Sequence, residues 1–101
     1  WCPPCRVEVP HLIDIQKRFG DRKFVLISVS LDRDIAAARR FVREKEMNWV
    51  HVIDSRSARE LAEKYEVRFI PSTFVIDRTG KIAATQLRGG ALKDKIGALL
   101  K

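Results

Sequence analysis

The sequence predicts an α/β sandwich built on a mixed sheet, and three observations lead to that prediction. An amphipathic helical pattern covers residues 2–19 and is followed by a near-continuous apolar run at 24–31. A strand of that composition is buried on both faces, as strands of parallel sheets are. The last third of the chain changes to two short strands joined by a turn, with a helix after them, which is typical of an antiparallel hairpin that joins the sheet.

The first predicted helix, over 2–19, has its apolar positions at helical spacing, and Gly20 follows as a stop. Leu12, Ile15 or Gln16, and Phe19 form the periodic stripe. Pro10 interrupts the pattern. A proline there either removes one helical hydrogen bond and kinks the axis, or marks the start of a second helix.

The middle of the chain predicts two more helices around a short strand. Asp32 or Asp34 can cap a helix that runs through about Glu46, and residues 49–53 form the strand. Ser57 followed by Glu60 has the form of a capping box and opens a helix through about residue 65. The inner stripe of the first of these helices consists of Ile35, Ala38, Phe41 and Val42.

The last third predicts a hairpin and a closing helix. Strands at 72–77 and 81–87 flank the sequence Asp-Arg-Thr-Gly, which is typical of a turn. Gly89 and Gly90 then break the strand pattern before a helix. The apolar positions of that helix are Leu92, Ile96, Leu99 and Leu100.

Length and composition predict a single domain over residues 1–101. A chain of 101 residues with 46% hydrophobic content supports one core, and it has no apolar run long enough to span a membrane. The formal net charge of +7 comes from basic residues scattered along the chain, which favours solvated helix faces over an acidic partner or an anionic membrane surface. Basic stripes with interleaved aromatic residues are absent from the sequence, so we expect no nucleic-acid partner.

The two cysteines of the chain, Cys2 and Cys5, form one C-x-x-C motif. Haem attachment needs a histidine directly after the second cysteine, and Arg6 stands there. Structural zinc needs four ligands, whereas His11 and His51 lie at unrelated spacings. A purely structural disulfide over so short a loop removes little entropy from the unfolded chain. The motif therefore favours redox chemistry.

The neighbours of the motif fit a reactive thiol. If Cys2 begins a helix, the positive end of the helix dipole stabilises its thiolate, and prolines at positions 3 and 4 suit a first turn. Arg6 adds a cation, and the ring of Trp1 can cover the site. We expect Cys2 to be the exposed attacking thiol and Cys5 the resolving thiol.

Two segments, Trp-Cys-Pro-Pro-Cys-Arg-Val-Glu-Val-Pro at 1–10 and Val-Arg-Phe-Ile-Pro-Ser-Thr-Phe-Val-Ile-Asp-Arg-Thr-Gly-Lys-Ile at 67–82, resemble the thioredoxin superfamily. More narrowly, the chain is similar to the TlpA-like thiol-disulfide oxidoreductases of bacteria, which include the thioredoxins of cytochrome c maturation. The resemblance covers essentially the whole chain. It implies a thioredoxin-like three-layer sandwich and a protein-disulfide reductase.

The resemblance also assigns roles to residues. Pro71 matches the cis-proline of the family, which lies beside the active-site disulfide, and the backbone of Ile70 is expected to bond an extended substrate peptide. Trp1, Pro3 and Pro4 complete the expected substrate-binding surface.

Glu8 matches an acidic helix position of the TlpA-like group. It follows Cys5 by one helical turn, so it can take up or relay the proton when Cys5 is activated. A carboxylate on a basic helix is also commonly just solvated, and the sequence leaves both interpretations open.

The chain departs from the family at its beginning. In thioredoxin-like folds a buried central strand runs directly into the W-C-x-x-C turn, whereas here the sequence starts at Trp1, and Met47 is its one methionine. We therefore expect a piece of a longer protein that lacks its N-terminal central strand. A signal or a membrane tether would lie upstream. The resemblance favours an extracytoplasmic location, periplasmic or membrane-anchored, with a cytoplasmic one still open, and a monomer when intact.

We expect no dissociable cofactor, because the redox group is the Cys2–Cys5 disulfide itself. The expected partners are protein thiols and disulfides, with an upstream dithiol as the electron donor. One alternative is a copper or other metal-handling protein that uses both thiols and a histidine, although copper chaperones of this fold resemble C-x-x-x-C. A peroxidase that uses Cys2 is another, but the T-x-x-C context of peroxiredoxins is missing.

Overall fold

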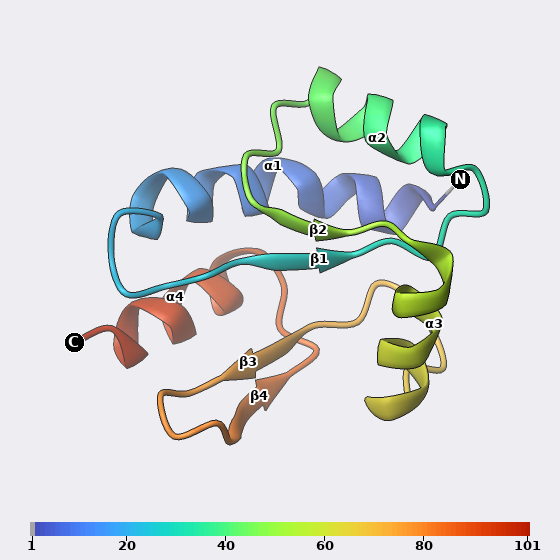
Figure 1. Ribbon diagram of the computed structural model, residues 1–101. Coiled ribbons are helices and arrows are strands. Elements are labelled where there is room, and N and C mark those ends of the chain that lie inside the picture. The colour runs from blue at the N-terminus through green and yellow to red at the C-terminus, as the bar shows by residue number, and fades with distance from the viewer. Residues whose placement is uncertain (1) are drawn as a thin grey trace. The chain divides into compact units, whose positions relative to one another are not determined.

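The computed structural model describes residues 2–101, in which helices and strands alternate until two consecutive strands precede the last helix (Figure 1). Its contacts divide the chain into two compact units. The first consists of the residues up to 24 together with 69–101, and the second of residues 25–68.

The first unit begins with helix α1, Pro3–Phe19, which is continuous through Pro10. The alternative of a second helix that starts at this proline is therefore wrong. Pro10 costs the helix one backbone hydrogen bond, to the carbonyl of Arg6, and the flanking turns keep the segment helical. Gly20 ends the helix, as expected, but with a right-handed φ of −64°.

Helix α4, Gly89–Leu99, packs against α1 and forms the core of this unit. The buried side chains are Ile15 and Phe19 from α1 and Leu92 and Ile96 from α4. Partly buried side chains surround them, namely Leu12, Phe24, Val75, Leu87 and Leu100. Leu99, another apolar position of the predicted helix, is 36% exposed. The core face of α4 follows the i, i+4 spacing of positions 92, 96 and 100, which leaves position 99 to the side.

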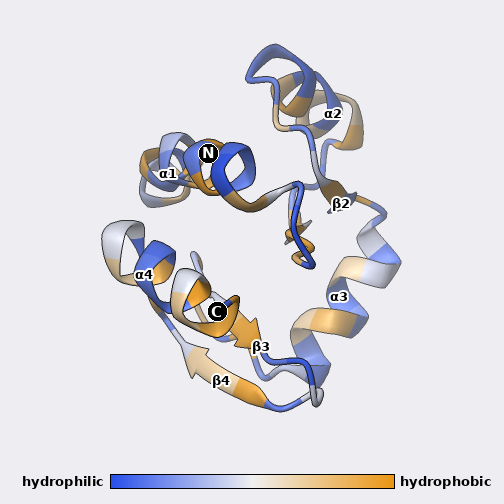
Figure 2. Ribbon diagram, turned by 90° about the vertical axis from the view of Figure 1, so that its left-hand side faces the viewer, coloured by the Kyte–Doolittle hydropathy of each residue, from blue (hydrophilic) through white to orange (hydrophobic). Residues whose placement is uncertain are grey.

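Strands β3, Phe74–Ile76, and β4, Ile82–Thr85, form the predicted antiparallel hairpin. Both are coloured mainly as hydrophobic in Figure 2. The carboxylate of Asp77 closes the turn by accepting hydrogen bonds from Thr79 and Lys81, and the first of these lowers the pKa of Asp77 most. Gly80 has φ +88°, a conformation that favours glycine.

The second unit contains a parallel pair of strands, β1, Ile27–Val29, and β2, Val50–Val52. Within residues 2–101 the parallel pair and the hairpin are two separate two-stranded sheets. Strand β1 is shorter than the predicted strand, and the expected burial of both its faces is wrong. Alternate residues of a strand point to the same face, and three of them, Val25, Ile27 and Val29, are 70%, 56% and 42% exposed. One face of the strand is thus uncovered in this structure.

Aspartates cap the two helices of this unit, α2, Ile35–Glu44, and α3, Ser55–Lys64. The sequence predicted Asp32 or Asp34 as the cap of α2. The structure shows that it is Asp34, which accepts a hydrogen bond from the N–H of Ala37. For α3 the predicted capping box is wrong, because Asp54 is the cap and Ser57 donates to it from inside the helix. These hydrogen bonds, that of the Ser57 backbone first, lower the pKa of Asp54. An aspartate carboxylate accepts from backbone N–H groups more strongly than a hydroxyl does, and it begins the helix earlier.

The core of the first unit predicts a large loss of stability for Ile15→Ala. Ile15 is 1% exposed, and we expect the substitution to lower the free energy of unfolding by about 2–5 kcal/mol. Urea unfolding followed by circular dichroism measures the loss. The matched control is Ile82→Ala on β4, where the side chain is 53% exposed and about 1 kcal/mol is expected. Equal losses in the two variants would contradict the assigned core.

Candidate active site around the Cys2–Cys5 disulfide

Cys2 and Cys5 are joined by a disulfide at the start of α1, with their Cα atoms 5.3 Å apart. Cys2 is the N-cap residue in an extended conformation, φ −118° and ψ 90°, and Cys5 lies in the first turn of the helix. Both are partly exposed. The two sulfurs therefore lie at the positive end of the helix dipole, where a thiolate is stabilised over a thiol once the bond is reduced.

The two prolines set which backbone donors are present at this end of α1. The first helical hydrogen bond runs from the N–H of Arg6 to the carbonyl of Cys2, at 3.1 Å. Of the three helical residues before Arg6, Pro3 and Pro4 have no N–H, so only Cys5 contributes one. Both prolines are exposed beside the disulfide, where the substrate-binding role was expected. Trp1 lies outside the described residues.

Glu8 is buried, with an exposed fraction of 7%, one turn of α1 after Cys5. The sequence left open whether Glu8 is merely a solvated carboxylate. The structure excludes this alternative, because the side chain is buried. Its Oε1 accepts a hydrogen bond of 3.0 Å from the backbone N–H of Gly89, at the first residue of α4. The sequence predicted Gly89 only as a break between the last strand and the closing helix. A glycine at the start of a helix is a signal that could have predicted the positive φ of +52° found here.

The peptide bond between Ile70 and Pro71 is cis. The hydroxyl of Ser72 donates to the carbonyl of Phe69 at 2.6 Å and spans this bond. Ile70 and Pro71 are partly buried, whereas Phe69 is 60% exposed. The loop thus presents an exposed aromatic ring next to the two residues expected to contact substrate, and Ser72 is a supporting residue that the sequence did not single out.

A second polar contact between α1 and α4 is the ion pair of Asp14 and Lys93. The Lys93 ammonium lies 3.0 Å from Oδ2 of Asp14, and both side chains are partly solvated. The hydrogen bond and the charge of Lys93 lower the pKa of the Asp14 carboxyl. The pair is thus a surface contact between the two helices, in addition to the buried hydrogen bond of Glu8.

The histidines do not join the cysteines in a cluster. His11 lies on α1, with its imidazole beside Gly89, and Nε2 of His51 is 2.8 Å from the carbonyl oxygen of Met47. Within residues 2–101 the structure contains no group of three or more His, Cys, Asp or Glu side chains placed to hold a metal ion.

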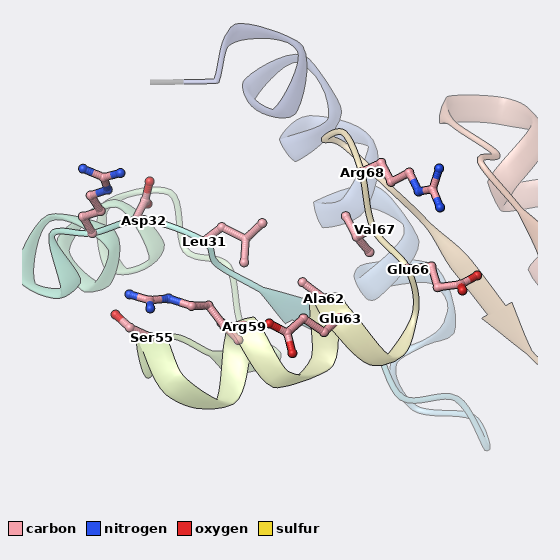
Figure 3. A pocket seen from close by; sticks show the side chains of 11 residues that line it. Leu31, Asp32, Ser55, Arg59, Ala62, Glu63, Glu66, Val67 and Arg68 are labelled. Carbon is pink, nitrogen blue, oxygen red and sulfur yellow. The ribbon is translucent and has the colours of Figure 1, made fainter.

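A separate open pocket of about 900 Å³ lies within the second unit. Figure 3 shows its lining, which comes from the segment after β1, from α3 and from the segment after α3. Oδ1 of Asp32, in this lining, is buried and has no hydrogen-bond partner in the described part of the chain. None of the predicted site residues that the structure describes lines the pocket.

With this geometry established, comparison with known proteins identifies the family. The model of the AhpC/TSA family matches residues 1–85. The chain belongs to the AhpC/TSA family.

Several relatives of the chain are named thiol-disulfide oxidoreductases. The chain is 26% identical over 101 residues to the thiol-disulfide oxidoreductase ResA of Bacillus thuringiensis subsp. konkukian, covering 100% of this chain and 57% of that protein. It thus spans little more than half the length of such relatives. This similarity confirms the resemblance to thiol-disulfide oxidoreductases that the sequence motifs indicated.

Solved structures confirm the thioredoxin-like fold. The thioredoxin domain of a thiol-disulfide oxidoreductase from Bacteroides vulgatus superposes with a TM-score of 0.89 at 28% identity, covering 99% of this chain and 72% of that one. A putative thiol:disulfide interchange protein DsbE from Chlorobium tepidum gives 0.87 at 26% identity, with 100% and 74% covered. No helix within residues 2–101 is long and apolar enough to cross a membrane.

The Asp14–Lys93 pair predicts a pH-dependent loss of stability in Lys93→Met. The pKa of Asp14 is lower in the folded chain than the ordinary value of 3.8, so the pair stabilises the fold above that pH. We expect the variant to be less stable than the parent at neutral pH. The difference should shrink as the pH falls through the lowered pKa, because the carboxyl is then protonated in both proteins.

Urea unfolding of both proteins at a series of pH values measures this difference. Lys95→Met is the matched control, since it removes the same charge from the same helix without this contact. A difference between Lys93→Met and the parent that stays constant from neutral pH to acid would contradict the prediction.

Proposed function

We propose that this protein is a thiol-disulfide oxidoreductase that exchanges its Cys2–Cys5 couple with the thiols and disulfides of partner proteins. The observation that carries the proposal is the disulfide itself, placed across the first turn of a helix. The names of the relatives support the same chemistry. The couple needs no dissociable cofactor, because the electrons enter and leave through sulfur.

Reduction of a substrate proceeds in two exchanges. The Cys2 thiolate attacks one sulfur of the substrate disulfide, a new S–S bond forms, and the other substrate sulfur leaves as a thiolate that takes up a proton. Cys5 loses its proton and attacks the sulfur of Cys2. The second substrate sulfur leaves with its electron pair, and the Cys2–Cys5 disulfide is restored. Two electrons and two protons pass to the substrate, and a partner dithiol supplies the next pair.

In this mechanism Glu8 accepts the proton that Cys5 loses in the second exchange. The two residues are one turn apart on α1, a spacing at which side chains are neighbours. Burial of Glu8 supports this role, since a carboxylate shielded from water exchanges protons with its neighbours in the protein rather than with solvent.

The substrate-binding surface in this proposal is formed by Trp1, Pro3, Pro4, Ile70 and Pro71. An extended peptide adds to the backbone of Ile70 as a strand does, while Pro71 lacks an N–H that would need a partner. The exposed ring of Phe69 supports an apolar contact with the peptide at the same loop.

We propose reduction as the direction of flow, at an extracytoplasmic site such as that of cytochrome c maturation. Thioredoxin-type couples range from about −270 mV for reductants to about −120 mV for oxidants, and a stabilised thiolate moves a couple toward the oxidising end. The first turn of α1 supports a reducing couple, because its two prolines leave few N–H donors for a thiolate. Equilibration with glutathione measures the potential, and a value near −120 mV would contradict this direction.

The mechanism predicts different behaviour of the two cysteines in an insulin-reduction assay. We expect Cys2→Ser to fall to the uncatalysed background, because the attacking thiol is gone. Cys5→Ser should lose turnover but accumulate a mixed disulfide with insulin, which intact-protein mass spectrometry detects. Multiple turnover by Cys2→Ser would end the proposal, and exchange of the two phenotypes would reverse the assigned roles.

A further inference from the structure

Glu8 is the one charged side chain that is buried among residues 2–101. Burial of a carboxylate is costly unless hydrogen bonds replace its water. The bond that replaces it comes from the N–H of Gly89, 81 residues away in the sequence. This donor lies at the first residue of α4, where the partial positive charge of the helix N-terminus adds to the attraction.

The amide of Gly89 can point at Glu8 because of the conformation of this glycine. Its φ is +52°, in the left-handed region that a residue with a Cβ adopts at a cost. A Cβ at this position would lie 3.8 Å from the ring of His11, which is ordinary contact, so conformation rather than space restricts the residue. Gly90 differs, since its φ is not positive and a Cβ there would meet nothing within 4 Å.

We propose that Gly89 is a positioning residue for thiol-disulfide exchange, which acts by holding Glu8 one turn from Cys5. This inference rests on the proposed function. The amide of Gly89 fixes Oε1 of Glu8 and thereby the orientation of the whole carboxylate, whose other oxygen takes the proton. In the resolving step the S–H bond of Cys5 breaks, its proton passes to Glu8, the S–S bond to Cys2 forms, and the substrate sulfur leaves with its electron pair.

The proposal separates the two exchanges, because Glu8 serves only the second one. We expect Gly89→Ala to slow resolution of a preformed mixed disulfide by about 10-fold, part of the 10²–10⁴ that a positioned acid or base contributes. Formation of the mixed disulfide, measured for the same substitution in a Cys5→Ser background, should stay within about 2-fold of the parent. Rapid acid quench followed by mass spectrometry gives both rates in the full-length protein.

Three further variants distinguish positioning from a general structural effect. Gly90→Ala is the matched control and should resolve at the parent rate. Gly89→Asn should recover most of the rate, since asparagine tolerates a positive φ and keeps the N–H. In a Glu8→Gln background, Gly89→Ala should slow resolution no further, because the group that it positions can no longer take a proton.

Resolution by Gly89→Ala at the parent rate, or equal slowing of both exchanges, would overturn the proposal. Should Gly89→Ala not fold, deuterium exchange of the Gly89 amide replaces it: we expect about 10-fold faster exchange in Glu8→Leu, which has no acceptor, than in the parent, and equal exchange would overturn the contact. If the parent protein itself fails to reduce insulin, the proposed function fails. If it reduces insulin and only the Gly89 results are negative, this inference alone fails.

Discussion

The packing of α1 against α4 is the constraint on which the active site depends. Helix α1 carries the disulfide in its first turn and the core residues Ile15 and Phe19 in its later turns. A helix is stiff over this length, so the contacts of its later turns with Leu92 and Ile96 also fix its beginning relative to α4. The core thus does more than stabilise the first unit, because it determines which part of α4 faces the residues next to the cysteines.

Glu8 connects the packing of α1 against α4 to the chemistry of the cysteines. An apolar residue would fill a buried position between two helices at lower cost, since a carboxylate there must keep a donor. The donor is a backbone amide of α4 rather than a mobile lysine or arginine side chain. A backbone donor cannot swing away, so the carboxylate keeps one orientation for as long as the two helices stay packed. The buried carboxylate therefore lowers the stability of the fold, but its orientation next to Cys5 is fixed.

Local signals were enough to predict the elements and the redox motif, whereas contacts distant in sequence were not. The C-x-x-C motif, the cap at Asp34 and the turn at Gly80 each depend on a few neighbouring residues, and the structure has all three. The bond between Glu8 and Gly89 joins residues 81 apart, and no periodicity connects them. The predicted cap of α3 was wrong because Asp54 and Ser57 both have side chains that can cap a helix, and the carboxylate of Asp54 is the acceptor.

The same distinction explains the second unit. Periodicity predicted the run around Ile27 as a strand buried on both faces, because β-branched residues fill it without polar interruption. Burial of a face is a property of what packs on it, and composition alone does not supply that partner. The side chains of Val25, Ile27 and Val50 are therefore exposed, although the apolar pattern predicts that they are buried. The composition of a strand is therefore a weaker guide to the burial of its faces than the side chains that pack on them.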